Sequence, residues 1–146
     1  PPPPRILISE IFYDAEGSDE GKEFIELYNS GEGTSDLVGW SLRRDGASLA
    51  TFGSKSEDNT VMHAHGFLLA GFNNYNGLPV HDLVRSASLP NTAAEISLVN
   101  PEGITVDVVR YSASVAAGES FERNSWESGE FHPQATPTPR NSLSGS

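Results

Sequence analysis

The sequence consists largely of short runs in which apolar and polar residues alternate, each bounded by Gly, Pro, Asn or Asp. The first three runs are residues 5–13 (RILISEIFY), 22–29 (KEFIELYN) and 36–44 (DLVGWSLRR). No stretch of about a dozen residues shows a helical period. Alternation with a period of two is typical of β-strands, and many short strands separated by turn residues are typical of an antiparallel sandwich or barrel. The sequence therefore predicts an all-β fold, an antiparallel β-sandwich.

The alternation also predicts which side chains point into the core. One face of the first run carries Ile6, Ile8, Glu10 and Phe12. In the third run Val38, Trp40 and Leu42 are aligned, so we expect the large indole of Trp40 to fill the core. Residues 100–103 (NPEG) separate two later runs, and Pro-x-Gly at such a position predicts a hairpin turn.

Both ends of the sequence have the composition of linkers. Residues 1–5 (PPPPR) form a stiff polyproline segment, and the end of the chain (PTPRNSLSGS) mixes Pro, Ser and Gly without an apolar period. We therefore predict a Pro-rich linker at 1–5, one folded domain at 6–131, and a Pro/Ser-rich tail or linker at 132–146. This organisation is typical of one module of a longer chain.

The charge of the chain limits the partners that it can have. Nine Lys and Arg against twenty Asp and Glu give 9 − 20 = −11, with a pI near 4.6. An acidic surface repels phosphate backbones and anionic lipids, and it attracts divalent cations or basic partners. We therefore expect no nucleic-acid partner. The chain lacks cysteine, and no apolar run approaches the roughly 20 residues of a membrane span, so we also expect no membrane insertion.

Several motifs, taken in order, resemble those of the lamin-tail domain in its bacterial form. They are ILISEIFYD (6–14), EFIELYNSG (23–31), DLVGWSLRRDG (36–46), GFLLAG (66–71), EISLVNPEGITVDVVRY (95–111) and, near the end, SFERNS (120–125) with TPTPRN (136–141). The resemblance implies an immunoglobulin-like β-sandwich and a non-catalytic interaction or scaffolding module. In bacteria such modules are commonly attached to secreted or surface enzymes and adhesive proteins. The resemblance therefore implies an extracellular or cell-surface location, neighbouring domains in the full-length chain, and a protein or cell-surface polymer as the partner.

Three polar residues of the strand-like runs are candidates for a structural role. Glu26 is expected where its strand leaves the sheet, accepting hydrogen bonds from the backbone of a neighbouring loop. Glu10 would be a similar strut, and Asn29, which precedes Ser-Gly, is typical of a turn. The alternative is that Glu10, Glu23 or Glu26 binds a cation together with Asp14.

The segment from Asp14 to Glu23 (DAEGSDEGKE) is the strongest indication of a metal site, because clusters of carboxylate oxygens suit Ca²⁺. Its candidate ligands are Asp14, Glu16, Asp19 and Glu23. The spacing does not fit the helix-loop-helix calcium loop, which needs Gly where this chain has Asp19 and Glu where it has Ile25. A solvated acidic loop is the main interpretation. A calcium-binding adhesion module is the alternative.

The sequence carries no motif of an enzyme. It contains neither a G-x-S-x-G nucleophile elbow nor a phosphate-binding glycine loop. We therefore expect no catalytic residues and no cofactor, apart from Ca²⁺ in the alternative above. A small metal-dependent hydrolase is a further, less favoured alternative.

Overall fold

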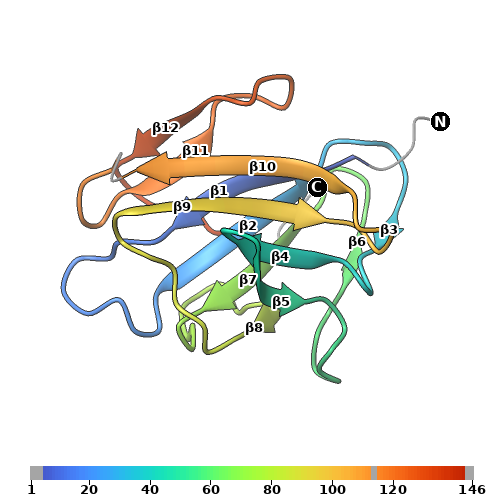
Figure 1. The fold of residues 1–146 in the computed structure, drawn as a ribbon, viewed down its shortest axis with the longest axis horizontal. Helices are drawn as coiled ribbons and strands as arrows, with labels where there is room; N and C mark the ends of the chain where they lie inside the picture. Colours follow the sequence, from blue (N-terminus) through green and yellow to red (C-terminus); the bar gives the residue numbers. More distant parts are fainter. Residues whose placement is uncertain (1–4, 113–114, 144–146) are drawn as a thin grey trace.

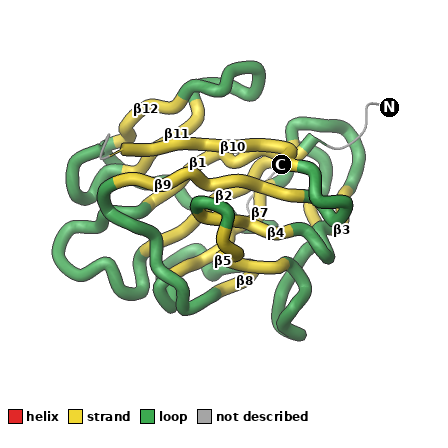
Figure 2. Tube along the Cα trace, in the orientation of Figure 1, coloured by secondary structure: helices red, strands yellow, loops and turns green. Residues whose placement is uncertain are grey.

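The computed structural model describes residues 5–112 and 115–143. Residues 1–4 and 144–146, which fall in the predicted linkers, lie outside this part. The described residues form strands, turns and loops without a helix (Figure 2). Accordingly, the described chain has no helix that is long and apolar enough to cross a membrane.

The largest sheet has six strands in the order β12-β11-β1-β2-β7-β8. Neighbouring strands within this sheet are antiparallel, except that β7 and β8 are parallel. The strands are β1 (Ile6–Phe12), β2 (Glu23–Asn29), β7 (Phe67–Phe72), β8 (Leu83–Val84), β11 (Ser120–Arg123) and β12 (Phe131–Gln134).

A four-stranded sheet in the order β10-β9-β4-β5 lies in front of β1, β2 and β7 in Figure 1. Its strands are β4 (Ser41–Arg44), β5 (Ala47–Thr51), β9 (Ala93–Val99) and β10 (Thr105–Ser112). A short pair, β3 (Ser35–Asp36) with β6 (Val61–Met62), completes the fold. The predicted β-sandwich is confirmed. The predicted hairpin is also present, because the Gly103 N–H donates to the Asn100 carbonyl between β9 and β10.

The core lies between the two large sheets and takes side chains from both. The six-stranded sheet contributes Ile25 and Leu27, and the four-stranded sheet contributes Ile96 and Leu98. Tyr13, just after β1, stacks on Tyr111 of β10 with ring centroids 3.7 Å apart. Residues next to these in β2 and β9 therefore face outward.

A bulge in β1 changes the predicted faces of the first run. The register with β2 shifts between Ile8 and Glu10, so one extra residue enters the strand. Ile6 and Ile8 point into the core before the bulge, and Ile11 does so after it. The prediction that Glu10 shares a face with Ile6 was therefore wrong. The bulge turns Glu10 to the outer face.

The prediction that Trp40 fills the core was also wrong, because Val38, Trp40 and Leu42 do not lie on one face of a continuous strand. Residues 36–44 are not one strand, because the chain turns at Val38 and Gly39, with φ of +87° at Gly39 and a bond from the Trp40 N–H to the Leu37 carbonyl. Leu37 is buried instead, and Val38 is 57% exposed. Trp40 is half-buried and packs against the margin of the core. The turn breaks the period of two on which the prediction rested.

Candidate functional site

Three carboxylates form a row across the outer face of the six-stranded sheet. Glu10 of β1 lies directly opposite Glu26 of β2 and Glu122 of β11. Glu10 and Glu26 are fully buried, and Glu122 is half-buried. We call these three residues the glutamate row. Like charges that lie opposite each other destabilise a sheet, and burial disfavours the charged form, so the row requires compensating donors.

Those donors come from residues 136–143, which we call the C-terminal strap. The strap crosses the outer face of the sheet, and the backbone N–H groups of its alternate residues each donate to a carboxylate. The bonds, each 2.9 Å, join Thr138 to Glu10, Arg140 to Glu26 and Ser142 to Asp82. Asp82 precedes β8 and also accepts the N–H of Leu69 in β7 at 2.8 Å. The strap therefore spans from β1 to the far edge of the sheet.

Pro137 and Pro139 occupy the positions that alternate with these donors. Proline has no N–H and favours an extended backbone, so Pro137 and Pro139 leave no unpaired N–H group beside the donors Thr138 and Arg140. Two residues of such a chain advance about 6 Å, and neighbouring strands lie about 4.8 Å apart, so the strap crosses the strands obliquely. Both prolines line a pocket of about 420 Å³ whose wall includes Phe12, Phe24 and Tyr75.

Glu26 is held by side chains as well as by the strap backbone. The guanidinium of Arg140 donates to both of its carboxylate oxygens, at 3.0 and 3.1 Å, and the Ser9 hydroxyl donates at 2.6 Å. Burial raises the pKa of Glu26 to about 7, although the bonds from Arg140 and Ser9 oppose this shift. Burial alone would lower the pKa of Arg140, but its bond to Glu26 raises it. For Glu26 the effect of burial outweighs these bonds, whereas for Arg140 the bonds to Glu26 outweigh the effect of burial.

Glu10 has hydroxyl and amide donors, and within residues 5–112 and 115–143 no ion pair with it is found. Ser120 donates to it at 2.6 Å and the Thr138 hydroxyl at 3.0 Å. Arg140 lies 3.6 Å from Glu122, whose pKa is raised by burial and by the neighbouring Glu10. The Arg140 guanidinium thus pairs with two of the three carboxylates, Glu26 and Glu122, and its carbon also lies 4.0 Å from the centre of the Phe67 ring.

This arrangement differs from the sequence-based interpretation in two ways. Glu10 and Glu26 lie within their strands and not where a strand leaves the sheet. Residues 132–146 were interpreted as a tail or linker beyond a domain that ends at 131. Residues 132–134 instead belong to β12, which pairs with β11, and residues 136–143 form the strap. The low-complexity composition of PTPRNS concealed contacts with residues more than a hundred positions away.

Asn29 is the last residue of β2 and is fully buried. Its side-chain oxygen accepts the N–H groups of Arg5 and Gly31, at 3.1 and 3.0 Å. Its side-chain nitrogen donates to the carbonyls of Gly33 and His63, at 2.8 and 3.2 Å. This amide therefore ties the turn that follows β2 to the N-terminal end of β1.

Two of the candidate calcium ligands accept backbone N–H groups of the protein itself. Glu23 is the first residue of β2, is 1% exposed and accepts the Leu89 N–H at 2.6 Å. Asp19 accepts the Ala15 N–H at 2.9 Å within the loop, and Glu16 is exposed. Over residues 5–112 and 115–143 no three His, Asp or Glu side chains are placed to hold a metal ion. The set of Asp14, Glu16, Asp19 and Glu23 stays a prediction, and the charges of Asp19 and Asp14 contribute to the raised pKa of Glu23.

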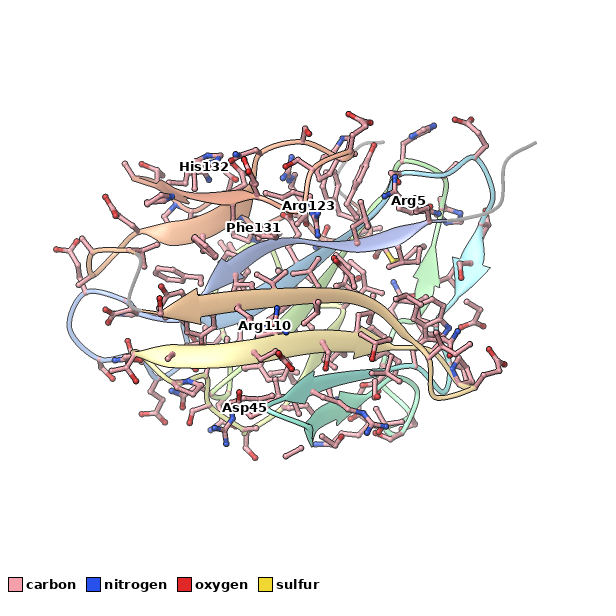
Figure 3. All side chains as sticks on the ribbon, turned by 45° about the horizontal axis from the view of Figure 1, so that its top comes forward. Arg5, Asp45, Arg110, Arg123, Phe131 and His132 are labelled. Carbon is pink, nitrogen blue, oxygen red and sulfur yellow. The ribbon has the colours of Figure 1, made fainter. Side chains whose placement is uncertain are left out.

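Sequence reasoning missed two buried ion pairs. Arg123 of β11 donates to the Ile8 carbonyl and to Asp107 of β10, so it links the two sheets (Figure 3). Arg85 donates through both terminal nitrogens to Asp58, and these side chains are 9% and 3% exposed. An arginine in a polar stretch gives no local signal of burial, because its partner is distant in sequence.

The chain matches a model of a known protein family. A family model described as the Lamin Tail Domain matches residues 1–113. The matched part ends before β11, so β11, β12 and the strap lie beyond it. The search of curated proteins found no match to the chain.

Proposed function

This chain belongs to the lamin tail domain family, and from that membership we propose that it is a non-catalytic interaction and scaffolding module. We place it as one domain of a larger bacterial protein that is secreted or attached to the cell surface. The observation that carries the proposal is that the buried carboxylates hold the backbone of the chain itself. Glu10, Glu23 and Glu26 each accept backbone N–H groups of this chain itself. Side chains engaged in this way support a fold and are not presented to a substrate.

The cavity between β1 and β10 supports the same proposal. It measures about 400 Å³, and its charged lining includes Arg5, Asp107, Arg123 and Glu127. Asp107 and Arg123 are paired with each other and with the backbone of Ile8. A general acid or base requires a free group within hydrogen-bonding reach of the reacting atom. In this cavity the buried pair serves to join the two sheets.

The partner that we propose is a protein or a cell-surface polymer. The net charge of −11 favours basic or neutral partners over phosphate-rich ones. Binding by such a module is measured with the fluorescently labelled chain, which is sedimented with purified bacterial cell walls and with intact cells over a range of salt concentrations. We expect saturable retention. Retention that does not saturate, or none at all, would contradict the proposal.

The non-catalytic part of the proposal needs its own assay. The full chain is incubated with chromogenic ester, phosphate ester, glycoside and peptide substrates, in the presence of Ca²⁺, Mg²⁺, Zn²⁺ or a chelator. We expect the rate in buffer alone. A higher rate that disappears in a folded Glu26→Gln or Glu10→Gln variant would show that the carboxylates are catalytic.

A further inference from the structure

The C-terminal strap is attached to the sandwich in an unusual way. It forms no strand, and carboxylate side chains hold its backbone where a sheet would use carbonyl groups. Its outer side is open to solvent, because Thr136, Thr138 and Leu143 are exposed. Ala135, which joins the strap to β12, is exposed as well. The strap can therefore leave the sheet without disturbing the core between the two sheets.

The surface under the strap is specific for its sequence. It accepts three N–H groups at positions two residues apart, namely Thr138, Arg140 and Ser142. It offers one guanidinium both the Glu26 carboxylate and the face of the Phe67 ring. Pro137 and Pro139, which precede the first two donors, line a pocket together with Phe12, Phe24 and Tyr75. Aromatic-lined grooves that receive extended proline-containing segments are a recurring mode of peptide recognition.

We propose that this surface is a binding groove for extended segments in which prolines alternate with N–H donors, and that a second copy of the chain is the partner that fills it. In this exchange the strap of one copy lies over the glutamate row of the other. The inference rests on the proposed interaction role and names a partner for it.

Charge and sequence favour a second copy as the occupant. Leaving the groove empty would strip Glu10 and Glu26 of donors, and buried carboxylates without partners are costly. Every copy carries residues 136–143, with the spacing and the arginine that the groove fits. Contacts in the exchanged and unexchanged forms are the same, so the balance depends on effective concentration. An isolated chain therefore keeps its own strap, and exchange grows as copies are concentrated or tethered side by side.

A fluorescent peptide with the sequence of residues 134–143 (QATPTPRNSL) tests the groove in the full chain. The strap of the chain is first weakened by Arg140→Ala. A second variant, Thr138→Pro, removes one N–H donor and leaves Arg140 in place. Arg110→Ala is the matched control, because Arg110 lies on β10 and pairs with Glu95, away from the strap (Figure 3). Fluorescence anisotropy reports binding, and circular dichroism reports whether each variant is folded.

We expect the peptide to bind the Arg140→Ala and Thr138→Pro chains at least about tenfold more tightly than the wild type or the control. A peptide with alanine in place of its arginine should lose this binding. In the unmodified protein, sedimentation should show a dimer that grows with concentration and is suppressed by excess peptide.

Three results would overturn the inference. They are folded variants that do not bind the peptide, equal binding by the Arg110→Ala control, and unfolding of both strap variants, which would make the strap an inseparable part of the core. Each of them would leave the retention on cell walls unchanged, so a failure here is distinguishable from a failure of the proposed function.

Discussion

Glu10 and Glu26 lie directly opposite each other on β1 and β2, and neither carboxylate reaches solvent. Two carboxylates so placed repel each other and lose hydration. Arg140 supplies the cation for Glu26, and hydroxyl and backbone donors serve Glu10. The position of these two residues therefore explains why the C-terminal strap is held against the sheet. Each carboxylate requires donors, and the strap provides a backbone N–H for each.

Two substitutions of Glu26 should separate the contribution of its charge from that of its hydrogen bonds. We expect Glu26→Ala to lower the free energy of unfolding by about 3–5 kcal/mol, since Arg140 and Ser9 lose their buried acceptor. Glu26→Gln should cost only about 1–2 kcal/mol, because the amide oxygen still accepts a hydrogen bond. Urea unfolding followed by tryptophan fluorescence measures both. Wild-type stability in the alanine variant would disprove the structural role.

Stability should fall as the pH rises from acidic to neutral. Burial raises the pKa of Glu23 and of Glu26 from the ordinary 4.5 to about 7. The native state therefore holds these protons more tightly than the unfolded chain. Their contribution is complete below pH 4.5 and is lost as the pH passes through about 7. We expect a loss of up to about 3 kcal/mol for each group.

Urea unfolding at a series of pH values checks this dependence. The Glu23→Gln variant should show a shallower slope, because it lacks one of the two carboxyl groups whose pKa is raised to about 7. A free energy of unfolding that is constant or increases from acidic to neutral pH would contradict the assignment.

Two arginines should differ in their effect on stability. Arg85 is paired with Asp58 where both side chains are almost fully buried, whereas the side chain of Arg110 is 73% exposed and that of its partner Glu95 is 40% exposed. Arg85→Ala leaves Asp58 charged and buried, so we expect a loss of about 3–5 kcal/mol. Arg110→Ala should cost less than about 1 kcal/mol. Thermal and urea unfolding compare them directly, and equal losses would refute the distinction.

Trp40 should contribute less than a core aromatic. Phe52 is 1% exposed, and Phe52→Ala should cost about 3–5 kcal/mol. Trp40 is half-buried at the margin of the core, so Trp40→Ala should cost about 1–2 kcal/mol. Chemical denaturation of the two variants is the measurement. A larger loss for Trp40→Ala than for Phe52→Ala would restore the original prediction from the alternation.

Calcium should not stabilise the acidic loop specifically. Glu23 already accepts the Leu89 N–H and Asp19 the Ala15 N–H, so each carboxylate has less free acceptor capacity for an ion. We expect millimolar CaCl₂ to raise the melting temperature no more than NaCl of equal ionic strength. A specific rise that is absent from the Asp14→Asn, Asp19→Asn double variant would establish the calcium site.

The sequence was sufficient to predict the strand-rich fold and the hairpin at residues 100–103, because both depend on local alternation and turn residues. It was insufficient for the bulge in β1, where one additional residue reverses the faces. It also missed the strap. Arg140 contacts Glu26 over 114 positions, through side-chain and backbone atoms that follow no periodic pattern. Periodicity predicts the local conformation of neighbouring residues. It contains no information about a contact between residues so far apart in the sequence.

The bonds from Ser120 and Thr138 to Glu10 join residues 110 and 128 positions apart. A ribosome delivers the N-terminal strands well before those donors. During synthesis Glu10 and Glu26 must therefore stay hydrated. Water cannot leave the outer face of β1 and β2 until the strap, residues 136–143, has emerged from the ribosome. Long-range contacts form late when their partners arrive late. We expect the nascent chain to remain open along this face, available to chaperones and proteases, until the strap seals it.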